Sequence, residues 1–313
     1  KNIIKARAFY NNKALEEVEN LQFVKAIGEY AFASSGIKSA TIGENVICDE
    51  GAFYLSSLET VTIGKNAIFG FASFGDCRSL KVVNMPDEGG VHIGEQCFMN
   101  CLQLKTIDLS KTDDTIEAYA FYNCIELLSA HLTNVKVIEE GAFVGCTKLL
   151  YVTLPIVESI GESAFGRVNE YASGAIFTEL VLPETLKTIG VGAFLGCEKL
   201  VEITIPKLIT KIDEFTFSYC LSLEKVVLPT TVTEIGQYAF AGCDLLKDIN
   251  LSNVSTFNNN VFYKCTSLEN VDLKNAEFIK ESAFESTSIE GNLVLNNLTY
   301  VGDYAFKDAM FTT

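Results

Sequence analysis

Proline, histidine and long apolar stretches are all scarce in this sequence. Only 5 of its 313 residues are proline while 48% are hydrophobic and 22 are phenylalanine, which excludes a disordered or low-complexity chain and indicates a large buried core. No apolar run approaches the roughly 18 residues that cross a bilayer, so we expect no membrane insertion. The 2 histidines leave few candidates for acid–base catalysis.

Positive charge is also limited. Lys and Arg together number 24, against 40 Asp and Glu, and the formal net charge is -16. Proteins that track nucleic acid or bind anionic membranes need a cationic face, so we expect neither partner. An acidic surface instead favours cationic partners. Lys1 is not followed by the charged and then apolar pattern of a signal peptide, but a processed or trimmed chain would also lack it, so localisation stays open.

What the sequence does contain is a repeat. A phenylalanine, most often preceded by alanine, recurs fourteen times, and twelve of the thirteen intervals measure 21–24 residues. One structural unit repeated fourteen times explains this regularity, and chance does not. The column consists of Phe9, Phe32, Phe53, Phe74, Phe98, Phe121, Phe143, Phe165, Phe194, Phe217, Phe240, Phe262, Phe284 and Phe306.

Each repeat also carries a strand pattern. Leu200, Ile203 and Ile205 show the spacing apolar-x-x-apolar-x-apolar, which returns in other repeats and ends in the two-residue period of a half-buried strand. A single short strand is unstable, but it can pair with the strand one repeat later, about 4.8 Å away, in a parallel sheet. Between the strands, Gly, Asp or Glu shortly before Ala-Phe predicts a short helix or 3₁₀ turn that contains Ala-Phe.

These residues resemble a known family. The stretch 189–194 (Ile-Gly-Val-Gly-Ala-Phe), followed by Cys197, Leu200 and Ile203, is similar to the repeat of BspA-like leucine-rich-repeat surface proteins, and the resemblance covers essentially the whole chain. It implies a leucine-rich-repeat solenoid, which is a curved, right-handed coil with one continuous parallel β-sheet and short helical or 3₁₀ turns on its convex side. Residues 1–313 would form a single domain of about fourteen repeats. Many family members are exported and adhere to proteins of a host or partner cell.

The interval of 29 residues between Phe165 and Phe194 departs from the repeat. If Phe177 takes the leucine position, about six extra residues lie within 166–176, and Val168 replaces the usual cysteine. Insertions in repeat arrays map to loops on one face, often a binding face, and Tyr171 is the aromatic candidate in this loop. Drift without function explains the insertion at least equally well.

The 10 cysteines occupy repeat positions rather than metal or disulfide patterns. Eight lie three residues after the column phenylalanine, Cys97 replaces the alanine before Phe98, and Cys48 takes an isoleucine position. These are small or apolar core positions, and no Cys-x-x-Cys pair supports zinc. Side chains in register point the same way, which hinders bridging, so we expect free thiols, no metal and no cofactor.

Catalytic chemistry has little support. His92 lies in a predicted turn, His131 lies on the outward side of a predicted strand, and neither has neighbours that resemble a triad. Acidic pairs such as Asp113-Asp114 fall in turns, where solvation explains them better than calcium does, since calcium needs six or more oxygen ligands. We therefore do not expect an enzyme.

The residues on either side of the central strand residue point outward, onto the open face of the sheet. These positions are rich in hydroxyl, amide and acidic side chains. On consecutive central strands they include His131, Tyr151, Glu179 and Glu202, which offer an aromatic residue flanked by carboxylates, and Tyr171 belongs to the nearby insertion. We expect these five residues to bind a basic protein segment or a glycan.

The sequence thus predicts a non-enzymatic binding module. By the family resemblance it would be a cell-surface or secreted microbial protein that recognises a protein or glycan on another cell or in the host matrix. Two alternatives stay open, namely an intracellular protein–protein interaction scaffold and the recognition arm of a larger enzyme whose catalytic domain lies outside this chain. The residues leave the oligomeric state undetermined.

Overall fold

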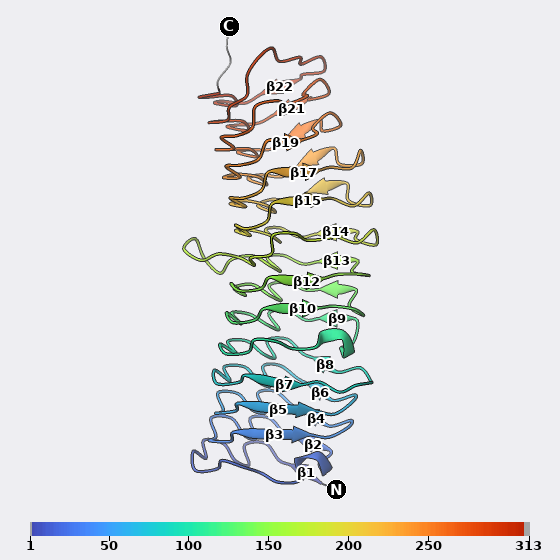
Figure 1. Cartoon of the computed structure of the whole chain (residues 1–313), viewed down its shortest axis with the longest axis vertical. Coiled ribbons are helices and arrows are strands. Elements are labelled where there is room, and N and C mark those ends of the chain that lie inside the picture. Colours follow the sequence, from blue (N-terminus) through green and yellow to red (C-terminus); the bar gives the residue numbers. More distant parts are fainter. Residues whose placement is uncertain (1, 310–313) are drawn as a thin grey trace. The chain divides into compact units, whose positions relative to one another are not determined.

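Parallel pairing between successive repeats defines the fold. The computed structural model describes residues 2–309. The chain divides into two compact units, Lys1–Pro155 (unit 1) and Ile156–Thr313 (unit 2). Within each unit the chain winds in flat turns, and each strand pairs in parallel with a strand of the neighbouring turn (Figure 1). The chain makes about 14 turns, which confirms the predicted repeat solenoid.

The predicted strands form what we call the first strand row. Residues alternate between exposed and buried, as in β3, where Ala40 and Ile42 are buried and Ser39 and Thr41 are exposed. In unit 1 the row consists of β3 (Ser39–Ile42), β5 (Thr60–Ile63), β7 (Val82–Asn84), β10 (Ser129–His131) and β12 (Tyr151–Thr153). In unit 2 it consists of β15 (Glu202–Thr204), β17 (Lys225–Val227) and β19 (Asp248–Ile249).

A second strand row, which the sequence did not predict, runs through the Ile-Gly positions. The structure therefore differs from the single continuous sheet that we expected. In unit 1 the row consists of β1 (Ile3–Ile4), β2 (Ala26–Ile27), β4 (Ile47–Cys48), β6 (Ile68–Phe69), β8 (His92–Ile93), β9 (Thr115–Ile116) and β11 (Val137–Ile138). In unit 2 it consists of β13 (Ser159–Ile160), β14 (Thr188–Ile189), β16 (Lys211–Ile212), β18 (Glu234–Ile235), β20 (Thr256–Phe257), β21 (Phe278–Ile279) and β22 (Tyr300–Val301).

Close approach between repeats explains the glycine that follows many of these strands. A Cβ at Gly236 would lie 2.7 Å from the backbone of Asp213 and Glu214 in the preceding repeat. Any larger residue would push the two repeats apart there. The glycine column therefore serves the stacking of repeats as well as the turn.

The Ala-Phe segments are not helical, so the prediction of a short helix or 3₁₀ turn there is wrong. The described 3₁₀ helices are η1 (Leu21–Phe23) and η2 (Leu109–Lys111), and neither contains Ala-Phe. Instead, successive amides alternate between two kinds of hydrogen bond. One amide donates to the next repeat, as Phe32 N does to Ala52 O (2.7 Å), and the following amide donates within its own turn, as Ala33 N does to Tyr30 O (3.2 Å). These segments, which we call the turn row, thus form a third ladder of hydrogen bonds.

Left-handed residues make this alternation possible. The residue two before each column phenylalanine has φ between 49° and 60°, as in Tyr30 and Tyr238, and a second left-handed residue follows two after it in every repeat except that of Phe165. For residues other than glycine this conformation costs roughly 1–2 kcal/mol each. Hydrogen bonds between repeats and burial of the phenylalanine offset that cost.

The column phenylalanines stack along the core of each unit. Neighbouring ring centroids are 5.0–5.5 Å apart in unit 1 and 5.3–5.8 Å apart in unit 2, and the rings are within 16° of parallel. Each ring therefore touches equivalent rings in the turns on either side, so the core is continuous along each unit.

None of the described helices has the length and apolarity needed to cross a membrane.

The cysteines form a second core column, as predicted. All 10 are buried as free thiols, and eight of them donate to the carbonyl of the column phenylalanine one repeat earlier, with Sγ to O distances of 3.1–3.5 Å. The hydroxyls that Thr287 and Ser35 carry at this position do not reach that carbonyl. Thr287 Oγ1 bonds within its own repeat, and Ser35 Oγ is buried without a partner in the described chain. Burial raises the pKa of the Cys77 and Cys124 thiols to about 12.

Removal of one ring from the stack should destabilise the protein strongly. We expect Phe121→Ala to lower the free energy of unfolding by about 3–5 kcal/mol, because the ring is fully buried. Its neighbours are held in place by backbone hydrogen bonds, so they cannot move in to fill the space left by the ring. Guanidinium unfolding followed by circular dichroism measures the change. Phe23→Ala is the control, since Phe23 is 65% exposed and should cost less than about 1 kcal/mol. Equal effects of the two variants would contradict the role assigned to the stack.

The cysteines should be inert in the folded protein. At pH 8 a thiol with a pKa of about 12 is roughly one part in ten thousand thiolate, which is the reactive form. We expect Ellman's reagent to label no cysteine of the native protein and all 10 after unfolding without reductant. Fewer than 10 labels in the unfolded protein would reveal native disulfides.

Candidate functional site

The outward side of the first strand row is an uncovered face. In β15, β17 and β10 the outer residues are exposed or half-buried while the central residue is buried. The exposed side chains include hydroxyls, amides, carboxylates and a tyrosine. This face can therefore contact a partner without any rearrangement of the core.

In unit 1 the structure places His131 and Tyr151 on adjacent strands of this face. Tyr151 pairs in register with Ser129, and His131 pairs with Thr153, whose Oγ1 lies 3.4 Å from His131 Nδ1. The Tyr151 side chain is 63% exposed and projects from β12. The two predicted residues thus share a face, two positions apart in register.

A cleft of about 390 Å³ opens beside His131. It lies where strand pairing stops after β7, and it is lined by Asn84, Thr106, Asp108, Ser129 and His131, among others. The hydrogen bond that Asp108 accepts from the Ser110 backbone N–H (2.9 Å) holds the pKa of that carboxyl below its usual value. The cleft therefore presents a carboxylate beside an imidazole and two hydroxyls.

In unit 2 the structure brings Glu179 and Glu202 together. The two residues form a parallel bridge, so their side chains lie side by side on the outward face. Lys225 is in register with Glu202, but its ammonium lies 3.8 Å from Asp248 Oδ2 instead. Like charges at neighbouring positions weaken a sheet. Neither glutamate has a cationic partner within residues 2–309.

The insertion leaves the stack of unit 2 as a loop, which is the yellow-green segment that extends outward from the turn row (Figure 1). Phe177 is buried against Phe165 and Phe194, as the predicted leucine position requires. Val168 does not take the cysteine position, which corrects the sequence-based assignment. Ala175 is buried there instead, and its N–H donates to Phe165 O (3.0 Å), because the chain rejoins the stack only after the loop.

Arg167 anchors the start of this loop. Its guanidinium carbon lies 4.5 Å from the centre of the Tyr219 ring, and its side chain passes over Gly196, where a Cβ would be 2.8 Å from Arg167 Cδ. Asn169 Oδ1 accepts from Tyr171 N (2.9 Å) and shapes the tip. Tyr171 is 91% exposed, so the loop presents this ring to solvent.

The five predicted site residues are divided between the units. His131 and Tyr151 belong to unit 1, whereas Glu179, Glu202 and Tyr171 belong to unit 2. The two pairs each lie on neighbouring outward positions, and Tyr171 lies on the loop. A single patch made of all five residues stays a prediction.

His92 is less isolated than the sequence suggested. It lies in β8, with Nδ1 2.8 Å from Asp113 Oδ2 and Nε2 3.4 Å from Glu117 Oε1. Asp113 is therefore not simply a solvated turn residue, and its buried Oδ1 has no partner in the described chain. Asp113 is hydrogen-bonded to Nδ1, and Glu117 faces Nε2, where a nucleophile activated by His92 would have to lie. No group of three or more His, Cys, Asp or Glu within residues 2–309 is arranged to hold a metal ion.

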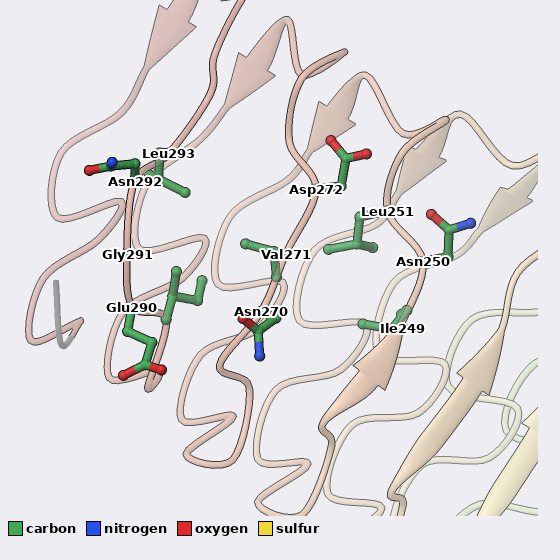
Figure 2. Close-up of a pocket in the computed structure, with 11 residues that line it drawn as sticks. Ile249, Asn250, Leu251, Asn270, Val271, Asp272, Glu290, Gly291, Asn292 and Leu293 are labelled. Atoms are coloured by element: carbon green, nitrogen blue, oxygen red, sulfur yellow. The ribbon is translucent and has the colours of Figure 1, made fainter. Parts of the chain in front are cut away.

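A second cleft, which sequence reasoning missed, lies in unit 2. Its volume is about 540 Å³, and it opens where strand pairing in the first row stops after β19 (Figure 2). The lining comes from three successive repeats and includes Asn250, Asn270, Asp272, Glu290 and Asn292. The only sequence signal was the change from threonine and valine to asparagine and aspartate at the outward positions, which lowers strand propensity.

Comparison with known proteins identifies the repeat family. The family model for the BspA type leucine rich repeat region (6 copies) matches residues 2–89, 47–172 and 167–290. A leucine-rich repeat protein from Bacteroides ovatus is 23% identical, with a TM-score of 0.56, over 91% of this chain and 68% of its own. A leucine rich cell surface protein from Faecalibacterium prausnitzii is 20% identical, with a TM-score of 0.47, over 99% of this chain and 81% of its own. No curated protein matches the sequence significantly.

Substitution of Gly196 should release the loop. Gly196 has φ +73°, and an alanine Cβ would also displace the Arg167 side chain, so we expect Gly196→Ala to destabilise the protein by about 1–2 kcal/mol. Trypsin should then cleave after Arg167 several times faster than in the parent protein.

Gly291→Ala is the matched control for this substitution. Gly291 has φ +80°, but a Cβ there would meet open space, so only the backbone strain should remain. Faster cleavage after Arg167 in both variants, or in neither, would contradict the anchoring role of Arg167.

Proposed function

The chain belongs to the BspA-type leucine-rich-repeat family, and from this premise we propose that it is a non-enzymatic recognition module that binds a basic protein segment. We further propose that a microbial cell displays or secretes it, as many members of this family are exported. In unit 1 the proposed contacts are His131 and Tyr151, on the outward face of the first strand row. In unit 2 they are Glu179 and Glu202, on that face, and Tyr171, on the inserted loop.

The observation that carries this proposal is the pair of adjacent, unpaired carboxylates at Glu179 and Glu202. Elsewhere on the surface, glutamates often pair with a lysine one repeat away, as Glu59 does with Lys81 at 3.1 Å and Glu224 does with Lys247 at 2.7 Å. Two like charges side by side repel each other in the free protein. A cationic partner would relieve that repulsion, and the formal net charge of -16 would steer it toward the surface.

Exposed aromatic residues provide the apolar contacts that such a complex needs. Tyr151 in unit 1 and Tyr171 in unit 2 are largely exposed, and tyrosine is among the residues that contribute most to binding energy at interfaces. His131 lies at the edge of the unit 1 cleft, next to Asp108. The stems of lysine or arginine side chains could pack on the tyrosine rings while their charged ends reach the carboxylates.

The chemistry of the chain supports binding rather than catalysis. Leucine-rich-repeat proteins are generally binding scaffolds, and the matched family is not a catalytic one. The cysteines are buried and protonated, and both nitrogens of His92 contact carboxylates. Nucleophilic catalysis needs an accessible nucleophile beside a free base, and these groups do not supply one.

Two other settings are compatible with the same binding face. An intracellular scaffold would use it for protein–protein interaction, and a larger enzyme would use it as a recognition arm. The sequence that flanks this chain in its gene distinguishes these cases. An export signal or wall anchor favours surface display, and an adjoining catalytic domain favours the recognition arm.

Neutralisation of the glutamate pair should weaken binding of a basic peptide. The probe is a fluorescein-labelled decapeptide of alternating lysine and arginine, measured by fluorescence anisotropy at 150 mM salt. We expect the double variant E179Q/E202Q to bind roughly tenfold more weakly, because it loses two charge-assisted contacts.

The control is the double variant E44Q/E184Q, which removes the same net charge. Glu44 and Glu184 lie 3.6 Å and 3.8 Å from Lys65 and Lys207, so neither is an unpaired carboxylate. We expect this variant to change the affinity by less than about twofold. Equal losses in both double variants would show that the peptide responds to overall charge, and the proposed site would be rejected.

A further inference from the structure

The cleft in unit 2 takes no part in the function proposed above. It is formed by three successive repeats at residues 249–251, 270–272 and 289–293, none of which belongs to the proposed protein-binding residues. Its volume of about 540 Å³ falls within the roughly 300–1,000 Å³ of sites that bind small molecules. The cleft is therefore large enough for a ligand of its own.

Polar side chains with free hydrogen-bonding groups line this cleft. Within residues 2–309, the side chains of Asn270, Glu290 and Asn292 make no hydrogen bond or ion pair with the protein. Asn250 uses its Oδ1 to accept from Ser252 N (3.0 Å), which leaves its two N–H donors free. The cleft thus offers several donors and acceptors that only solvent or a ligand can satisfy.

The arrangement of these groups suits a ligand with a polar rim and an apolar face. Figure 2 shows Asn270 and Glu290 together on one side, Asn250 and Asp272 on the other, and Val271 and Leu251 between them. Gly291 adds no side chain, and a Cβ there would meet open space. Leu251 is buried, whereas Val271 and Leu293 are half-buried, so these two side chains supply the apolar surface that a ligand can touch.

The backbone adds further donors. In complete parts of the first row the amides bond to the preceding repeat, as Lys247 N and Asp248 N both donate to Glu224 O (3.1 Å). No backbone amide of residues 269–273 donates to another described backbone group, because strand pairing has stopped after β19. Unpaired amides of this kind bind acceptor oxygens of a ligand readily.

We propose that this cleft binds a neutral oligosaccharide. Each sugar hydroxyl both donates and accepts, which matches amide side chains that carry donors and an acceptor together. The C–H face of a sugar ring would pack on the half-buried side chains of Val271 and Leu293. A cationic ligand fits less well, because Lys274 Nζ lies 2.9 Å from Asp272 Oδ2 and already neutralises one of the two carboxylates.

Nuclear magnetic resonance tests the proposal directly. The ¹⁵N-labelled full chain is titrated with neutral trisaccharides of glucose, mannose, galactose and N-acetylglucosamine, and with tetralysine. We expect at least one trisaccharide to shift the side-chain amide signals of Asn270 and Asn292 until they saturate. Tetralysine should leave these signals unchanged.

Three variants assign the binding to the cleft. N270A/N292A should weaken the trisaccharide roughly tenfold or more, because several hydrogen bonds are lost. Asn84→Ala is the matched control, since it removes an outward asparagine of unit 1 that donates to Thr62 Oγ1 (3.2 Å), and it should change the affinity less than about twofold. Glu290→Gln should retain binding to within about threefold, because a neutral ligand needs the acceptor and not the charge.

Three outcomes would overturn the proposal. The first is that no trisaccharide shifts the amides of the cleft. The second is that N270A/N292A binds as tightly as the parent protein. The third is that tetralysine shifts the same amides and that Glu290→Gln abolishes this effect, which would identify a cationic ligand. Failure of the decapeptide experiment would not affect this test, because the two sites share no residue.

Discussion

Hydrogen bonding between the backbones of successive repeats is the interaction on which the structure depends. A repeat of about 22 residues cannot cover its own apolar side chains, and each of its strands has only two to four residues. Pairing in three rows satisfies the backbone and brings the phenylalanines of neighbouring turns to about 5 Å from each other. Stability is therefore a property of adjacent repeats and not of a single repeat.

The same constraint explains features that would be costly in isolation. Tyr30, Tyr238 and many equivalent residues hold left-handed backbone conformations, because only this geometry directs alternate amides to the next repeat. Cysteine suits the position three residues after phenylalanine because its thiol fills a small space and reaches the carbonyl of the preceding repeat. Repeats with similar backbones thus accept the side chains that fit the space left by the neighbouring repeat.

Binding can use only what stacking leaves exposed, and the proposed sites lie at such positions. The outward positions of the first row are free to vary, so a tyrosine or a pair of carboxylates can stand there without loss of the core. Both clefts lie where this row stops pairing, after β7 in unit 1 and after β19 in unit 2. The repeat of Phe165 lacks the second left-handed residue, and there the inserted loop takes the place of the regular turn. Each departure from regularity therefore creates a surface that the regular repeat does not have.

The sequence by itself determined the repeat length, the parallel first row, the phenylalanine and cysteine columns and the outward position of residues such as Tyr151 and Glu202. These follow from periodicity, because a residue type that returns every 22 positions must meet the same environment. Only the tertiary structure decided the second strand row, the non-helical turns, the place of Ala175 and the contacts of His92. Two-residue strands carry too little local pattern to be recognised, and left-handed turns are stabilised by the adjacent repeat. The unit 2 cleft belongs to the same class, because it arises from the absence of pairing between repeats and no single repeat encodes it.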